Sequence, residues 1–187
     1  MTINELINKI KFIVLTPGKA FADLKKEKNI KLAVSFYAVL SLINLIIYVL
    51  ITYLFPKTNA VASLNLQNGA FYVVTYIFGI IFSFVIARIT HFWIKLFKGK
   101  GDFKNTYQLI VYSQTPTLLL GFFPAISFIG WIYELVIFIR GTEVLHGFNR
   151  KKALLVVFLP RLILTLVFIG VAAYLFYLPA LGEMKLN

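Results

Sequence analysis

The stretch that decides the fold runs from Thr106 to Pro160, TYQLIVYSQTPTLLLGFFPAISFIGWIYELVIFIRGTEVLHGFNRKKALLVVFLP. No charged residue occurs between Asn105 and Tyr133, and glycine and proline lie near the middle of this run. One helix from Asn105 to Ile139 would extend ~52 Å at ~1.5 Å per residue, whereas a hydrocarbon core is ~30 Å thick. We therefore predict two membrane spans joined by a tight turn, with a re-entrant hairpin as the alternative.

The composition of the whole chain is that of a multi-pass membrane protein. Of its 187 residues, 60% are hydrophobic and only 14% are charged, whereas about a quarter of a soluble domain is charged. The net charge is +12, but the basic residues lie in short blocks between apolar runs. These blocks are typical of topology signals that meet anionic lipid headgroups, and we expect no nucleic-acid partner. The absence of cysteine excludes disulfides and thiolate metal sites.

The predicted fold is all-α: a bundle of five transmembrane helices preceded by a short amphipathic segment at the interface. We divide the chain into a basic cytoplasmic segment, 1–31, a transmembrane domain, 32–181, and a short tail, 182–187. Within the domain the apolar runs predict spans at approximately 32–55, 70–94, 106–123, 125–145 and 153–178.

The first segment is predicted to contain two short helices. Apolar residues recur at helical spacing between Ile3 and Val14, with polar residues on most of the other face. This pattern favours a helix that lies in the interface plane. Thr16 followed by Pro17 indicates the start of a second helix, because proline is favoured at the first helical position.

The distribution of lysine and arginine predicts the orientation. Seven lie in the first segment, four between Lys95 and Lys104, and four between Arg140 and Lys152. This asymmetry places the N-terminus in the cytoplasm and the C-terminus outside. The residues expected to face headgroups are Lys25, Lys26, Lys98, Lys100, Arg150, Lys151 and Lys152.

Glu134 is the most informative polar residue of the spans. It and Arg161 lie at similar distances from the turn that joins the fourth and fifth spans. Because an unpaired charge inside a bilayer costs at least ~2.5 kcal/mol, we predict an ion pair between them, with Arg88 as the alternative partner. A structural pair that sets helix register is the default role, and transport or proton relay is the alternative. Gln114 lies near Pro116 on a further polar face, which Thr117 shares.

Small residues and prolines predict where helices approach closely or bend. Gly79, Ser83 and Ala87 recur at every fourth residue of the second span. The other packing or hinge candidates are Pro116, Gly121, Pro124 and Gly130.

No motif in the chain points to catalysis, a cofactor or a metal. The sequence GKGD at residues 99–102 matches the GxGD of intramembrane aspartyl proteases, but no second intramembrane aspartate accompanies it. We expect Asp102 instead to cap the third span. His91 and His146 lack companion ligands in the sequence, so we expect no zinc site.

The order of these features resembles the Yip family, the Ypt/Rab-interacting membrane proteins. The resemblance rests on TPGKAF at residues 16–21, GKGDFKNTYQLIVYSQTP at 99–116 and FPAISFIGWIYELVIFIRGTEVLHGFNRKKALLVVFLP at 123–160. It implies a five-helix membrane domain without known catalysis, in a compact member of prokaryotic type. The eukaryotic relatives engage small GTPases and have a long polar N-terminal region, whereas the segment 1–31 is short, so we do not expect recruitment of such GTPases.

We therefore expect a non-enzymatic protein of the cell membrane that organises the membrane or binds membrane partners. The expected partners are the anionic headgroups of the cytoplasmic face and another membrane protein or a second copy of the chain. The alternative function is a small transporter or channel component that uses Glu134 and Arg161.

Overall fold

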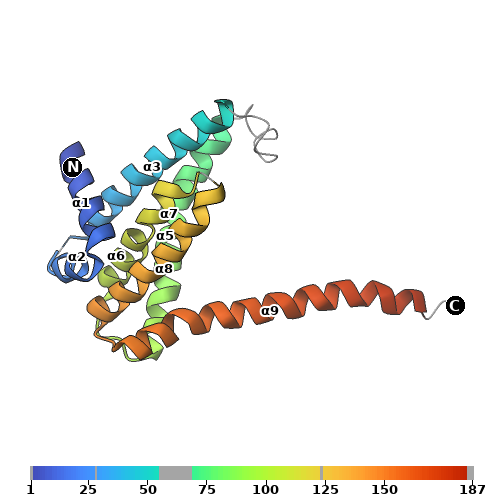
Figure 1. The fold of residues 1–187 in the computed structure, drawn as a ribbon. Helices are drawn as coiled ribbons and strands as arrows, with labels where there is room; N and C mark the ends of the chain where they lie inside the picture. Colours follow the sequence, from blue (N-terminus) through green and yellow to red (C-terminus); the bar gives the residue numbers. More distant parts are fainter. Residues whose placement is uncertain (1, 28, 55–68, 123, 185–187) are drawn as a thin grey trace.

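The computed structural model describes residues 2–27, 29–54, 69–122 and 124–184, and all regular structure in these ranges is α-helical. The helices, in chain order, are α1 (Ile3–Leu15), α2 (Pro17–Leu24), α3 (Ile30–Leu54), α5 (Gly69–Leu96), α6 (Phe103–Ser113), α7 (Thr115–Leu120), α8 (Pro124–His146) and α9 (Arg150–Met184). Figure 1 shows a bundle with α1 and α2 against one end and α9 projecting from it.

Three helices are long and apolar enough to cross a membrane. They are α3 with 25 residues, α5 with 28, and the first 26 residues of α9, Arg150–Leu175. The third and fourth predicted spans correspond to α6 with α7 and to α8, which are not among these three. The chain is therefore an all-helical membrane protein with several apolar helices of membrane length.

Helix α6 forms the centre of the bundle. Every side chain from Asn105 to Ser113 is buried, and α6 contacts α3, α5, α7 and α8. The N-terminus of α6 is capped as predicted, because the Asp102 carboxylate accepts the Asn105 N–H at 2.8 Å. An interior helix of this kind needs no polar face, which agrees with the absence of charge after Lys104.

The predicted third span is not one helix. Helix α6 ends at Ser113 and α7 begins at Thr115, with Pro116 in the first turn of α7. Proline removes a backbone donor and clashes with the preceding turn, so an uninterrupted helix through this position is unfavourable. The predicted tight turn between the third and fourth spans is also present, since α7 ends at Leu120, Gly121 and Phe122 form a turn, and α8 begins at Pro124. Residues 106–120 therefore form two short helices.

The N-terminal helices cover one flank of the bundle. Leu6 and Ile13 of α1 and Phe21 of α2 are buried, and α2 packs against α8. Helix α2 begins at Pro17 as predicted, although the Thr16 hydroxyl donates back to the Phe12 carbonyl instead of capping α2. These two helices are therefore part of the folded core.

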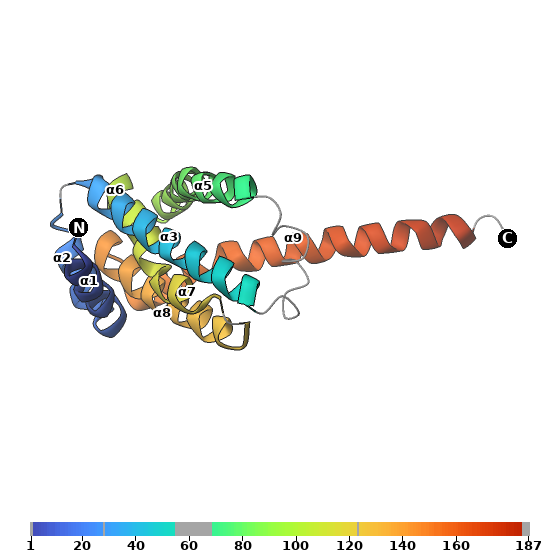
Figure 2. The ribbon, with the colours of Figure 1, turned by 90° about the horizontal axis from the view of Figure 1, so that it is seen from above.

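Helix α9 leaves the bundle after its first turns (Figures 1 and 2). Its contacts near the bundle include Val156, whose carbonyl accepts the Trp93 indole N–H at 3.0 Å. From Leu162 to Leu175 almost every side chain is exposed. The outer part of α9 is thus apolar on all sides without protein around it.

Candidate functional site

A cleft of about 400 Å³ lies between α5, α6, α8 and α9. Its walls are mostly apolar, and its polar side chains are those of Thr90, Ser113, Gln114, Glu134 and Arg161. The structure therefore brings three of the four predicted intramembrane polar residues to one place. Arg88 does not line this cleft.

Glu134 and Arg161 face the same cleft, but each has another partner. The Thr117 hydroxyl donates to Glu134, and the Arg161 guanidinium donates to the Val157 carbonyl of its own helix. Among the described residues, the salt bridges with N to O distances within 4.0 Å do not include this pair. The predicted direct ion pair is therefore not formed, because α9 diverges from α8 where Arg161 lies.

The other two predicted polar residues, Arg88 and Gln114, have different surroundings. The Arg88 guanidinium sits 4.6 Å from the centre of the Phe103 ring, a cation–π arrangement between α5 and α6. Arg88 therefore takes an aromatic partner and not Glu134. Gln114 occupies the break between α6 and α7, where it lines the cleft.

Two of the predicted hinge residues create a close contact between α7 and α8. A Cβ added at Gly130 would lie 3.1 Å from the Pro116 carbonyl oxygen, so glycine lets the two helices approach. Gly121 follows the last residue of α7 as its C-terminal cap. Pro124 is the first residue of α8. These residues shape the hairpin that holds Glu134 beside Thr117.

The three small residues predicted to mediate packing on α5, Gly79, Ser83 and Ala87, differ in how closely they pack. The Ser83 hydroxyl lies 3.2 Å from the Tyr107 hydroxyl, and Ala87 is fully buried. A Cβ at Gly79 would meet nothing within 4 Å, and Gly79 lines a second cavity of about 370 Å³ between α3 and α5. The stripe thus supports the α5–α6 contact through Ser83, and Ala87 belongs to the buried core.

The predicted headgroup-facing residues are exposed at one end of the bundle. The Lys25 ammonium donates to the Val144 carbonyl at 3.2 Å, and the Lys152 ammonium lies 5.1 Å from the centre of the Phe148 ring. Lys26 pairs with Asp23 on the surface. The remaining exposed members of this basic set are Lys98, Lys100, Arg150 and Lys151.

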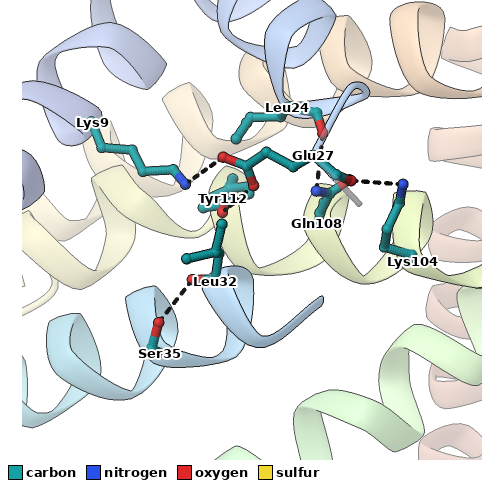
Figure 3. A network of polar contacts seen from close by, with 8 residues as sticks. All are labelled: Lys9, Leu24, Glu27, Leu32, Ser35, Lys104, Gln108 and Tyr112. Carbon is teal, nitrogen blue, oxygen red and sulfur yellow. Dashed lines mark hydrogen bonds and ion pairs between the residues drawn. The ribbon is translucent and has the colours of Figure 1, made fainter. Parts of the chain in front are cut away.

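A polar network that the sequence did not reveal ties α1 and α2 to α6 (Figure 3). The Glu27 carboxylate accepts from the Lys9 ammonium at 2.9 Å and from the Tyr112 hydroxyl at 3.5 Å. The Lys104 ammonium donates to the Glu27 carbonyl, and the Gln108 amide donates to the Leu24 carbonyl. The available signal was that Glu27 is an acid within a lysine-rich run.

His91 and His146 contact the same hydroxyl, that of Thr106, although they are far apart in the sequence. The Thr106 hydroxyl lies 2.7 Å from His91 Nδ1 and 3.4 Å from His146 Nε2. Burial lowers the pKa of His146, the last residue of α8, to about 4, with His91 and Lys95 adding to the effect. His146 is therefore neutral at neutral pH. Among the described residues, no three metal-ligating side chains gather into one group.

The fold and the cleft together define a multi-pass, all-helical membrane protein with a small polar site between its helices. Residues 11–172 match the model of the Yip1 domain. Because this match covers most of the chain, the protein belongs to the Yip1 domain family, as the sequence resemblance predicted. Comparisons with curated proteins and with solved structures find no match.

Proposed function

We propose that this chain is a non-enzymatic membrane protein that organises its bilayer by binding other membrane proteins and lipids. The observation that carries the proposal is the outer part of α9, which is apolar on every side and extends beyond the bundle. Packing between membrane helices needs such a free helical surface. The family match agrees with a membrane role. No finding favours the alternative of a transporter or channel component.

The proposed function is tested by a photoreactive residue in native membranes. Phe168 of α9 is 73% exposed, whereas Val157 of the same helix is 1% exposed. A photoreactive side chain at Phe168 is expected to form a discrete protein adduct, either with a second copy of the chain or with another membrane protein. The same side chain at Val157 should give no adduct with another protein, because Val157 is buried inside the chain. Lipid adducts alone at Phe168 would contradict partner binding through α9.

The proposed topology has five crossings, with the N-terminus in the cytoplasm and the C-terminus outside a prokaryotic cell. Support comes from the three apolar helices of membrane length and from the basic loops, since the α5–α6 and α8–α9 connections lie at the same end of the bundle (Figure 1). Lysine and arginine are favoured on the cytoplasmic side. The same end would meet anionic headgroups.

Cysteine labelling tests whether the α7–α8 hairpin crosses the membrane. The chain has no native cysteine, so Phe122→Cys and Lys98→Cys each provide a single labelling site. Phe122→Cys is expected to react with an impermeant maleimide outside intact cells, because the connection after α7 lies opposite the basic loops. Lys98→Cys should react only after permeabilisation. If both cysteines reacted only after permeabilisation, the α7–α8 hairpin would be re-entrant and would not cross the membrane.

A further inference from the structure

The cleft between α5 and α9 has exposed apolar side chains at its rim. Ile94 and Val157 form its buried inner wall, while Ile89 and Leu164, which are 61% and 68% exposed, lie at its rim. These rim residues belong to two helices of membrane-spanning length. A molecule dissolved in the bilayer could therefore enter the cleft between α5 and α9 without passing through water.

The cleft contains two charged groups with unused hydrogen-bonding capacity. A guanidinium has five N–H donors, and the hydrogen bond described for Arg161 goes to a neutral carbonyl on its own helix. Glu134 accepts from the neutral Thr117 hydroxyl through one of its two oxygens. A cation and an anion thus line one cavity without touching each other. A ligand that carries both signs of charge would complement them.

The polar groups of the cleft lie at the level of α1. The Tyr133 hydroxyl donates to the Val14 carbonyl near the end of α1, and Glu134 is the next residue, ~1.5 Å further along α8. On α6, the Tyr112 hydroxyl reaches Glu27, which pairs with Lys9 of α1. Two helices therefore place these cleft residues at the same level of the bundle as the end of α1.

We propose that this cleft binds the headgroup of an ethanolamine phospholipid, with the phosphate on Arg161 and the primary ammonium on Glu134. This inference rests on the proposed function, in which the protein binds lipids. The acyl chains would leave the cleft between Ile89 and Leu164 and continue into the bilayer. Arginine suits the phosphate because its planar donors match phosphate oxygens.

The charge pattern selects ethanolamine over the other common headgroups. A choline headgroup has no N–H to donate to Glu134, and quaternary ammonium groups are recognised mainly by aromatic cages. An anionic phosphoglycerol headgroup would satisfy Arg161 but leave Glu134 facing a phosphate without a counter-charge. An ethanolamine headgroup supplies both a phosphate and a hydrogen-bonding cation. The preference should therefore depend on Glu134, and retention of the phosphate should depend on Arg161.

Native mass spectrometry of the purified full-length protein tests this site with three lipids of identical acyl chains. The probes are phosphatidylethanolamine, phosphatidylcholine and phosphatidylglycerol at equal concentrations. We expect retention of phosphatidylethanolamine at least about tenfold above phosphatidylcholine, the ratio that corresponds to one charge-assisted hydrogen bond. Glu134→Gln should remove most of this preference, and Arg161→Gln should reduce retention of all three lipids. Arg140→Gln is the matched control, because Arg140 pairs with Glu143 outside the cleft.

A second measurement keeps the test independent of the charge variants. Trp93 lines the cleft, and the chain has two tryptophans, so Trp131→Phe leaves Trp93 as the sole fluorescent reporter. Brominated phosphatidylethanolamine should quench its fluorescence more strongly than brominated phosphatidylcholine.

Equal retention and equal quenching by phosphatidylethanolamine and phosphatidylcholine would overturn the proposal. Stronger retention of phosphatidylglycerol than of phosphatidylethanolamine would overturn the ethanolamine assignment. If Arg140→Gln reduced lipid retention as much as Arg161→Gln does, the lipids would bind outside the cleft, and the proposal would be wrong. The partner-binding function fails separately, through the absence of protein adducts at Phe168.

Discussion

Replacing Gly141 with leucine is expected to loosen the N-terminal helices from the bundle and to destabilise the protein by about 1 to 3 kcal/mol. A Cβ at this position would lie 2.5 Å from Leu109 Cδ1 and 2.8 Å from two ring atoms of Phe21. Both side chains are fully buried, so little room is left for them to move. The measurement is the midpoint of thermal unfolding in detergent, with tryptic cleavage at Lys11 and Lys19 as the local readout.

Two comparisons separate overpacking from a general effect of the substitution. Gly170→Leu is the matched control, because a Cβ there would meet nothing within 4 Å and leucine has the higher helix propensity. The double variant Phe21→Ala with Gly141→Leu should recover part of the loss, since it removes the clashing ring. Strictly additive damage would contradict the contact between α2 and α8 as the cause.

Replacing Glu27 with glutamine is expected to cost about 1 to 2 kcal/mol and to release α1 from α6. The substitution removes the charge that holds the Lys9 ammonium at 2.9 Å, where both side chains are at most one-quarter exposed. It also weakens the acceptor for the Tyr112 hydroxyl. Hydrogen exchange of α1, measured by mass spectrometry, should become faster, while exchange of α6 changes less.

The matched control for Glu27 is Asp23→Asn. Asp23 and Lys26 are also 2.9 Å apart, but their side chains are 61% and 78% exposed. Solvent screens such a pair, so its loss should cost less than about 1 kcal/mol. If Asp23→Asn accelerates exchange in α1 as much as Glu27→Gln, the Glu27 network is not what holds the N-terminal helices.

The long helices were predictable from local composition. The uncharged run after Lys31 anticipates α3, and the run that precedes Lys95 anticipates α5, because a membrane-length apolar segment has few alternatives to a helix. Pro17 and Asp102 also mark helix starts that the structure contains. These features depend only on residues within one or two turns of each other.

The division of the third predicted span into two helices was harder to predict. Pro116 signals a distortion, but proline is tolerated within membrane helices when neighbouring groups satisfy the freed backbone. In this chain the Thr115 hydroxyl donates to the Tyr112 carbonyl, and the Asn44 amide donates to the Leu118 carbonyl from α3. The second of these contacts comes from 74 residues away, so no local pattern could reveal it.

The candidate site was only partly predictable for the same reason. Helical periodicity placed Thr117 on a polar face of the third predicted span and Glu134 inside the fourth, but it did not predict the hydrogen bond that joins them. The position of Arg161 depends on how far α9 diverges, which periodicity does not specify. The Glu27 network depends on how α1 and α2 fold back onto α6, with 85 residues between Glu27 and Tyr112. Such contacts follow from tertiary packing and leave almost no trace in local sequence.

Helix α9 also has a length that does not match an ordinary bilayer. After the basic residues Arg150 to Lys152, its apolar part from Ala153 to Leu175 would measure ~35 Å at ~1.5 Å per residue, against a hydrocarbon core of ~30 Å. Tilting relieves this hydrophobic mismatch at a modest free-energy cost per ångström. Because only the first turns of α9 pack against the bundle, the local thickness of the bilayer would set the angle between α9 and the bundle. A thicker membrane would bring α9 upright, and a thinner one would splay it further from the other helices.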